Sequence, residues 1–262
     1  MKNTFKNWFA ALLLAAPMSM AVAAGGHANY EKVDIDLGDQ VSLQRGAQIF
    51  TNYCLSCHSA TGMRFNRLQD IGLTEDEIKK NLMFTTDKVG DVMQAAMTPT
   101  EGKKWFGAAP PDLTLIARSR GADYLYAYLR GFYQDPTRPT GWNNTVFDKV
   151  GMPHPLWEQQ GVKAVELDKD GQPVWEKDEH GNLVPKLYWE STGLHSRRLP
   201  TGKVIEKEYD DYVRDLVNYM VYMGEPAQMQ RKQIGYIVLI FLLAVMLPLA
   251  YFLKKEYWKD VH

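Results

Sequence analysis

The chain has 262 residues, of which 45% are hydrophobic and 23% are charged, and its formal net charge is −1. This composition is typical of a folded protein with one large domain or two small ones, and it excludes a disordered chain. Because the charge is close to neutral, we expect no nucleic-acid partner.

The first 24 residues predict a secretory signal peptide. Lys2 and Lys6 precede a short apolar run, and Ala21 and Ala23 fit an A-x-A cleavage site. A retained membrane anchor is disfavoured because Pro17 interrupts a run that is already short for a bilayer. We therefore expect the chain after residue 24 to be exported.

A helix is expected from about Ser42 to Tyr53, directly before the motif "CLSCH" at 54–58. Gly46 interrupts this helix, which costs about 1 kcal/mol relative to alanine unless another backbone approaches closely there. The expected crossing partner is a later helix within 206–224. Its apolar stripe consists of Tyr209, Val213, Leu216, Met220 and Met223.

The motif Cys54-x-x-Cys57-His58 contains both cysteines of the chain. A zinc site would need further ligands from the scattered His27, His154, His180, His195 or His262. A redox pair usually begins a helix after a strand, whereas the residues before Cys54 have a helical pattern. Covalent haem attachment uses all three residues, with two thioether bonds and a histidine ligand to iron. One motif predicts one covalently bound c-type haem.

The sixth iron ligand decides what such a haem does, and methionine is typical of electron carriers. Three methionines stay as candidates, namely Met93, Met97 and Met152. Met152 is favoured because it lies in "KVGMPHPLW", where flanking glycine and proline predict a stiff irregular loop. His154 is the competing ligand, and Met97 is the second choice among the methionines.

Three further elements follow the motif. Thr74 and Glu77 can form a capping box at the start of a helix, and 122–130 predicts another helix. Residues 162–189 alternate in polarity, with turns expected at Asp170-Gly171 and His180-Gly181. This pattern predicts a β-ribbon between the Met152 loop and the last soluble helix.

The run from Ile234 to Leu253 carries no charge and, as a helix, spans roughly 30 Å, the thickness of a bilayer core. Basic residues flank it and aromatic residues lie near its far end, which is typical of a transmembrane helix. Pro248 requires a local adjustment that satisfies the carbonyl it frees. The predicted organisation is a signal peptide (1–24), a periplasmic haem domain (25–230), a transmembrane helix (231–254) and a cytoplasmic tail (255–262).

The chain resembles the cytochrome c1 family, the haem subunits of quinol–cytochrome c oxidoreductase (bc1) complexes. The resemblance lies in "RGAQIFTNYCLSCHS" at 45–59, "APPDLTLIARSRGADYLYAYLRGFY" at 109–133, "GMP" at 151–153 and the C-terminal anchor. The C-x-x-C-H motif fits any c-type cytochrome, whereas the Pro-Pro-Asp-Leu block and the anchor are more selective. The resemblance implies a mainly α fold, with a class I cytochrome c-like haem domain, an inserted β-ribbon and one C-terminal transmembrane helix.

The resemblance also implies the roles of single residues. His58 and Met152 would be the axial ligands, and Cys54 and Cys57 the covalent sites. Arg120 and Tyr124 match positions that contact a haem propionate, a role that suits a guanidinium because it forms forked hydrogen bonds to a carboxylate. The alternatives for Arg120 are a surface ion pair or an exchange of roles with Arg118. Pro110 and Pro111 would form part of the haem cleft.

The implied function is electron transfer within a bc1 complex, expected to be dimeric, in the inner membrane of a bacterium. Cytochrome b oxidises a quinol, the Rieske iron–sulfur protein delivers an electron to this subunit, and a soluble or tethered c-type cytochrome receives it. The enzyme activity belongs to the complex, and this chain carries electrons. One alternative is a tethered c-type cytochrome that donates to a terminal oxidase. The other is a haem sensor or peroxidase with an open sixth site.

Two hypotheses concern the β-ribbon. Some family members brace the methionine-ligand segment with a disulfide, and here no cysteine is left to form one, so the ribbon is a candidate brace. The stretch 158–180 also contains seven acids against three lysines, which favours either electrostatic docking of a basic cytochrome or simple solubility. These acids are Glu158, Glu166, Asp168, Asp170, Glu176, Asp178 and Glu179.

Overall fold

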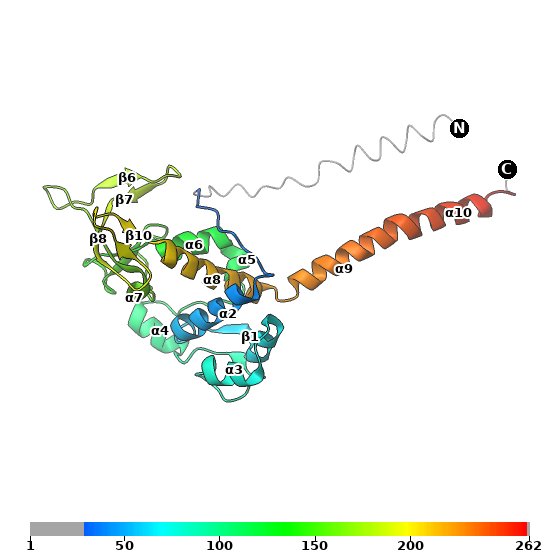
Figure 1. Cartoon of the computed structure of the whole chain (residues 1–262), viewed down its shortest axis with the longest axis horizontal. Helices are drawn as coiled ribbons and strands as arrows, with labels where there is room; N and C mark the ends of the chain where they lie inside the picture. The colour runs from blue at the N-terminus through cyan, green and yellow to red at the C-terminus, as the bar shows by residue number, and fades with distance from the viewer. Residues whose placement is uncertain (1–28, 261–262) are drawn as a thin grey trace.

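The computed structural model describes residues 29–260 and shows a folded domain from which one long helix projects (Figure 1). The predicted signal peptide, residues 1–24, lies outside the described residues. The domain is mainly helical with several small sheets, which confirms the predicted fold class.

Two helices that are far apart in the sequence cross at Gly46. They are α2 (Gln40–Ile49) and α8 (Lys207–Gly224). A Cβ atom at position 46 would stand 2.1 Å from the carbonyl oxygen of Asp215 and 2.6 Å from Cβ of Tyr219. Only glycine permits this approach, so the crossing predicted from the sequence is confirmed.

Polar side chains also join α2 to α8. Asp215 is 4% exposed, and its carboxylate accepts hydrogen bonds from Ser42 Oγ at 2.7 Å and from Arg45 Nε at 2.5 Å. Asn218 Nδ2 donates to Ser42 Oγ at 3.0 Å. A buried carboxylate is tolerated only where it is paired and hydrogen-bonded. This network therefore fixes how the two helices align along each other.

The other helices pack around this pair. α5 and α6 lie against α8, and the 3₁₀ turn η2 contacts α2 and α3. Thr74 and Glu77 form both halves of the predicted capping box, and a second box at Thr98 and Glu101, which was not predicted, begins α4. The bounds are η2 (Phe65–Ile71), α3 (Glu75–Asn81), α4 (Pro99–Phe106), α5 (Ile116–Arg120) and α6 (Ala122–Arg130), with a two-stranded sheet of β1 (Ala60–Arg64) and β2 (Val92–Met93).

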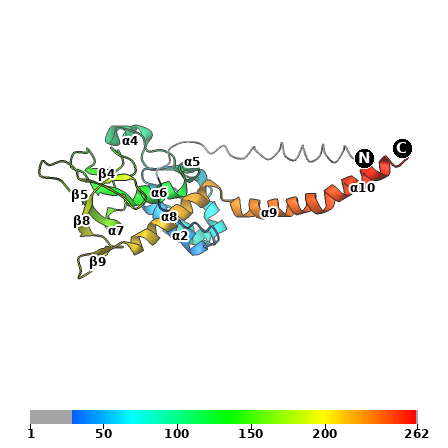
Figure 2. The same cartoon turned by 90° about the horizontal axis from the view of Figure 1, so that it is seen from above.

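The predicted β-ribbon is present, and its inner strands β5 and β8 belong to a four-stranded sheet (Figure 2). β5 pairs antiparallel with β8 and in parallel with β3, giving the strand order β4-β3-β5-β8. The outer strands β6 and β7 form a separate antiparallel pair. Gly171 and Gly181 have φ angles of 76° and 82° at the two predicted turns. The bounds are β3 (Phe132–Gln134), β4 (Trp142–Asn144), α7 (Trp157–Gln160), β5 (Gly161–Val165), β6 (Trp175–Lys177), β7 (Leu183–Pro185), β8 (Leu187–Thr192), β9 (Arg197–Arg198) and β10 (Val204–Ile205).

Some acids of the ribbon have structural roles. Glu166 pairs with Lys186 at 2.8 Å. Asp168 and Asp178 each accept backbone N–H hydrogen bonds that close one of the two turns. The docking hypothesis for the acidic stretch stays a prediction, and it rests on the acids without such a role.

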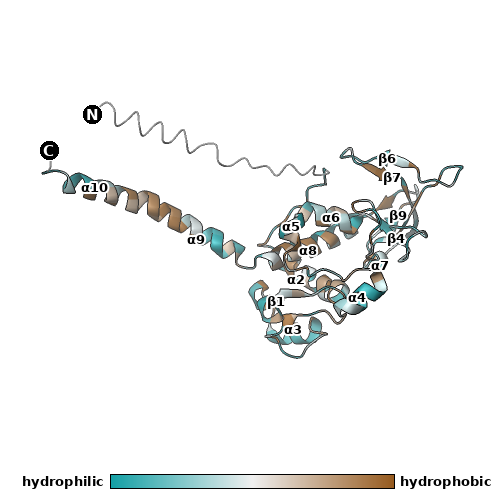
Figure 3. Ribbon diagram, turned by 180° about the vertical axis from the view of Figure 1, so that it is seen from behind, coloured by the Kyte–Doolittle hydropathy of each residue, from teal (hydrophilic) through white to brown (hydrophobic). Residues whose placement is uncertain are grey.

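A continuous helix, Gln228–Tyr257, leaves the domain (Figure 3). Its 30 residues include an apolar window of mean hydropathy 2.6, no part of which is buried, so it fits a membrane anchor and contains the predicted segment 231–254. Directly before Pro248 the helix widens into a π-turn, which is the local adjustment that a proline requires. Its parts are α9 (Gln228–Phe241), the π-turn η3 (Leu242–Met246) and α10 (Leu247–Tyr257).

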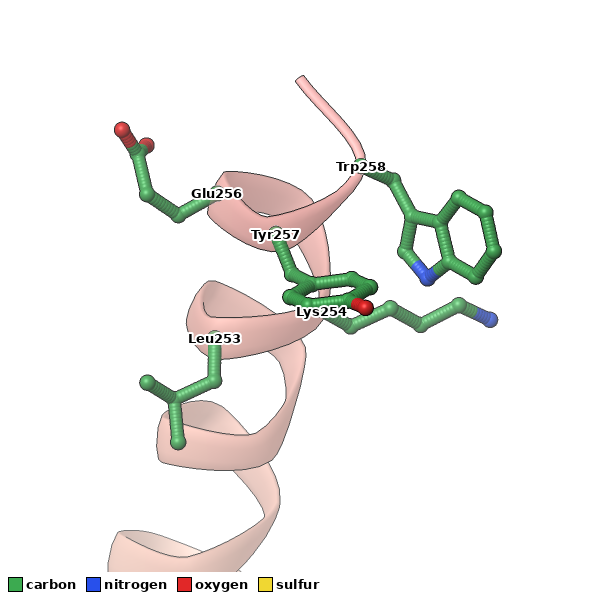
Figure 4. A pocket seen from close by; sticks show the side chains of 5 residues that line it. All are labelled: Leu253, Lys254, Glu256, Tyr257 and Trp258. Atoms are coloured by element: carbon green, nitrogen blue, oxygen red, sulfur yellow. The ribbon is translucent and has the colours of Figure 1, made fainter. Parts of the chain in front are cut away.

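Aromatic and basic side chains gather at the far end of this helix. Figure 4 shows Lys254, Tyr257 and Trp258 around a shallow hollow, and the two aromatic rings meet edge to face with centroids 5.5 Å apart. Such side chains are typical of the lipid headgroup region. The predicted boundary between anchor and tail, at residues 254 and 255, lies within this end of the helix and stays a prediction.

Candidate haem site

The C-x-x-C-H motif forms one helical turn at the end of α2. The π-turn η1 (Phe50–Cys54) comes first, closed by a hydrogen bond of 3.0 Å from Leu55 N to Phe50 O. The carbonyl of Cys54 then accepts from Cys57 N at 3.1 Å and from His58 N at 2.8 Å. Residues three and four apart in a helical turn share a face, so the two thiols and the imidazole lie on the same side of the chain.

Both thiols are free of a disulfide. Cys54 is 8% exposed, and burial raises the pKa of its thiol to about 12, whereas Cys57 is partly exposed. Within residues 29–260, no group of three or more His, Cys, Asp or Glu side chains is arranged to hold a metal ion, so the zinc interpretation finds no ligand set there. Both side chains are therefore free thiols, as covalent attachment to a haem would require.

The imidazole of His58 is oriented by the diproline segment. Its Nδ1 lies 2.8 Å from the carbonyl oxygen of Pro111. Because a carbonyl only accepts, Nδ1 carries the proton and Nε2 keeps its lone pair. Burial, opposed by this hydrogen bond, lowers the pKa of His58 and favours the neutral ring that a metal requires. The histidine thus fits an axial ligand, with a carbonyl as the partner that fixes its tautomer.

Asp112 holds the diproline segment against the strand that follows the motif. Its carboxylate accepts from Thr61 N at 2.8 Å, from Thr61 Oγ1 at 2.9 Å and from Thr114 N at 2.8 Å. Partial burial alone would raise the pKa of Asp112, but the hydrogen bonds from Thr114 and Thr61 lower it overall. An ionised Asp112 therefore fixes the carbonyl that orients His58.

Replacing Asp112 with alanine is expected to lower the free energy of unfolding by about 1–2 kcal/mol, because three hydrogen bonds to a carboxylate are lost at a partly exposed site. Asp34→Ala is the matched control, since Asp34 forms no hydrogen bond with other described residues. Chemical unfolding of the purified protein, followed by circular dichroism, measures both. Equal unfolding midpoints for the two variants would contradict the role given to Asp112.

Met152 lies in a loop that is held by the hairpin of β3 and β4. Asn143 is 4% exposed, and its side chain bonds to Lys149 N at 2.8 Å and to Asp148 Oδ1 at 3.0 Å. Lys149 has a φ angle of 58°, an unusual value for a residue other than glycine. Arg138 donates to the Lys149 carbonyl at 3.1 Å. The backbone leading to Met152 is therefore constrained by side chains from the hairpin.

The inner end of the ribbon reaches the same hairpin. β5, the first strand of the ribbon, pairs in parallel with β3 at Ala164 and Gln134. Asn143 and Arg138 contact the loop directly through hydrogen bonds. The hypothesis that the ribbon braces the Met152 loop stays a prediction.

His154 has a protein partner at each ring nitrogen. Its Nε2 lies 2.9 Å from Gln160 Oε1, and its Nδ1 accepts from Leu156 N at 3.4 Å. The ring stacks on Phe132 with centroids 4.7 Å apart, and it is 3% exposed. Burial lowers the pKa of His154 to about 3. Both nitrogens are engaged in a neutral ring, which leaves no lone pair for a metal.

The other two methionine candidates lie elsewhere. Met93 is fully buried in the core, where its sulfur accepts a hydrogen bond from Tyr219 Oη at 3.5 Å. The backbone N–H of Met97 donates to Ser56 O at 3.1 Å, inside the C-x-x-C-H motif. Met97 is thus held next to the motif that supplies His58, whereas a haem bound by His58 would need its sixth ligand from the opposite face.

A row of side chains on α6 connects Arg120 to the Met152 loop. The Arg120 guanidinium lies 5.7 Å from the ring centroid of Tyr124, which stacks on Tyr128 at 5.9 Å. Tyr128 Oη lies 3.5 Å from Met152 Sδ. Arg120 forms no ion pair with other residues in 29–260, whereas Arg118 lies 3.5 Å from Glu225 and Arg231 pairs with the same carboxylate.

The predicted site residues therefore form two groups. One joins the motif to Pro111, and the other joins Arg120 and Tyr124 to Met152. No hydrogen bond or aromatic contact between described residues links the two groups. Sequence reasoning missed three supporting residues: Asp112, Tyr128 and Asn143. Helical spacing from Tyr124 would have placed Tyr128 on the same face, whereas no local pattern marks Asn143.

A mainly helical domain around a C-x-x-C-H turn, with a histidine held at Nδ1 by a backbone carbonyl, is typical of a c-type cytochrome. The model of the Cytochrome C1 family matches this chain at residues 34–207 and 202–261. The chain belongs to the cytochrome c1 family, whose members are haem subunits of the bc1 oxidoreductase complex.

Known relatives are similar over nearly the whole chain. A protein of Nitrosomonas europaea named ammonia monooxygenase gamma subunit is 48% identical, over 95% of this chain and 96% of its own length. A cytochrome c1 of Allochromatium vinosum is 46% identical, over 97% and 98%. A cytochrome c1 of Rhodospirillum rubrum is 28% identical, over 95% and 96%. The chain is assigned to the family because the family model matches most of its length. The name of a single relative does not decide this assignment.

Proposed function

We propose that this chain is the membrane-anchored mono-haem electron-transfer subunit of a bc1 complex. It accepts electrons from the Rieske iron–sulfur protein and passes them to a soluble or tethered c-type cytochrome, while cytochrome b oxidises the quinol. The signal peptide and the C-terminal helix would place the haem domain on the periplasmic side of a bacterial inner membrane. The proposal rests on family membership together with one observation, the hydrogen bond from His58 Nδ1 to Pro111 O.

A haem bound here supplies a centre that gains and loses one electron, held by thioether bonds to Cys54 and Cys57. His58 would be one axial ligand, because its Nδ1 is bonded and its Nε2 is available. Met152 would be the other. This choice is supported by the engaged nitrogens of His154, by the core position of Met93 and by the tie between Met97 and the motif.

The remaining site residues would orient the group and exclude water. Arg120 is exposed and forms no ion pair with described residues, so its guanidinium is available to a propionate, and Tyr124 lies directly beneath it. Pro110 and Pro111 form the stiff segment that carries the His58 partner.

The test is a reduced-minus-oxidised optical spectrum of the tagged protein, isolated from its own membranes in mild detergent, followed by addition of a quinol. Bands of b-type haem together with a c-type band, and reduction of the c-type haem by quinol that a bc1 inhibitor blocks, are the expected results. A c-type band alone in an intact preparation, with no reduction by quinol, would favour a tethered carrier for a terminal oxidase. Carbon monoxide binding to the reduced protein would instead indicate an open sixth site.

A further inference from the structure

One hydroxyl group lies within hydrogen-bond distance of the proposed methionine ligand. Tyr128 Oη is 3.5 Å from Met152 Sδ, a normal separation for a hydrogen bond to sulfur. A thioether sulfur has two lone pairs, so it can bind a metal with one and accept a hydrogen bond with the other. Tyr128 therefore contacts the sulfur without competing for its place at the iron.

The ring of Tyr128 is fixed by aromatic neighbours on two sides. It stacks on Tyr124 with an interplanar angle of 17° and a centroid distance of 5.9 Å. It also meets Phe132 edge to face, at 75° and 5.3 Å. Such contacts restrict how the ring moves and so restrict where its hydroxyl points.

The backbone of Tyr128 is hydrogen-bonded to β4, the strand that directly precedes the Met152 loop. Asn144 Nδ2 donates to the Tyr128 carbonyl at 2.8 Å, and Asn144 Oδ1 accepts from Val146 N at 2.9 Å. One side chain of β4 therefore contacts both the helix that carries Tyr128 and the loop that carries Met152. The separation between hydroxyl and sulfur is set by these rigid elements rather than by a flexible side chain alone.

We propose that Tyr128 is a positioning residue that holds the Met152 thioether through its hydroxyl hydrogen bond and thereby raises the reduction potential of the haem. The inference rests on the proposed function, since it requires Met152 as an axial ligand. A donor at the sulfur withdraws electron density from it, and this disfavours the oxidised iron more than the reduced iron. Hydrogen bonds to ligands are a recognised means of tuning a metal centre.

The test compares Tyr128→Phe with Tyr126→Phe in the haem-loaded protein. The first substitution keeps the ring stack and removes only the hydroxyl oxygen. The control makes the same change two residues away in α6, where the Tyr126 ring lies 4.6 Å from the Arg130 guanidinium. A redox titration measures the midpoint potential, and the absorption band of the sulfur–iron bond in the oxidised protein reports on ligation. Tyr128→Phe is expected to lower the potential and shift the band, and the control is expected to change neither.

Met152→Ala separates the failure of this inference from the failure of the proposed function. If Met152→Ala keeps the sulfur–iron band, Met152 is not the ligand, and the inference about Tyr128 is overturned together with that ligand assignment, whereas the electron-transfer function fails only in the quinol test. If it loses the band while Tyr128→Phe matches the wild type in potential and spectrum, only the role of Tyr128 is overturned. In the double variant, the tyrosine substitution is expected to cause no further shift, because it acts through the sulfur.

Discussion

Replacing Gly46 with alanine is expected to lower the free energy of unfolding by about 3 kcal/mol or more. The new Cβ would stand 2.1 Å from the Asp215 carbonyl oxygen and 2.6 Å from Cβ of Tyr219. Neither atom belongs to the far end of a flexible side chain, so α2 and α8 would have to move apart. Such a movement would also disturb the buried bonds of Asp215 to Ser42 and Arg45.

Gly90→Ala is the matched control for this variant, since a Cβ at position 90 would meet no atom within 4 Å. Both variants are unfolded thermally in the haem-loaded form, with circular dichroism as the measure of folding and the haem absorbance as the measure of the site. Because α2 leads directly into the motif, both signals should fall at a lower temperature for Gly46→Ala. Equal melting temperatures for the two variants would contradict this prediction, because they would show that α2 and α8 accommodate the new methyl group with little loss of stability.

Replacing Asn143 with alanine is expected to lower the free energy of unfolding by roughly 2–4 kcal/mol, because a buried amide with several partners is lost. Its oxygen accepts from Lys149 N, and its nitrogen donates to Asp148 Oδ1 and to Asp135 Oδ2, the last at 3.1 Å. Without these bonds, only the hydrogen bond from Arg138 to the Lys149 carbonyl still holds Lys149 at its positive φ angle. We expect the Met152 loop to loosen and part of the oxidised haem to lose its sulfur ligand.

Asn182→Ala is the control, because it removes an asparagine from the β6–β7 turn of the ribbon whose side chain donates two hydrogen bonds. The sulfur–iron absorption band and the rate of carbon monoxide binding by the reduced protein report on ligation in each variant. Asn143→Ala should weaken the band and speed the binding, and Asn182→Ala should leave both unchanged. Weakening of the band by the ribbon variant alone would contradict this role of Asn143 and favour the ribbon as the brace of the loop.

The parts of the fold that the sequence predicted are those with a local physical signal. Gly46 is costly inside a helix, so its presence indicated a close crossing, and the apolar stripe of 206–224 identified the partner helix. The capping box at Thr74 and Glu77 and the glycine turns of the ribbon are likewise signals within a few residues. The second capping box, Thr98 and Glu101, carried the same signal and was overlooked.

The parts that the sequence did not predict depend on pairings between distant segments. The parallel contact of β5 with β3 joins the ribbon to the hairpin, and no pattern inside either segment specifies it. The same is true of Asn143 and of the hydrogen bond from Tyr128 to Met152, which exist only once α6, the hairpin and the loop are assembled. For the haem site, the motif indicated the covalent residues and His58, whereas the residues that orient its ligands emerged from the three-dimensional contacts.

The joint between the domain and its anchor is short and is held by ion pairs on both sides. α8 ends at Gly224 and α9 begins at Gln228, so only three residues separate them, a reach of about 10 Å when extended. Glu225 lies in this joint and pairs with Arg118 of the domain and Arg231 of the anchor, which fastens both sides together. Under the proposed function, the haem domain would therefore lie close to the membrane surface. A redox partner would then have to bring its own centre to the domain and leave again, so the partner would set the timing of each delivery.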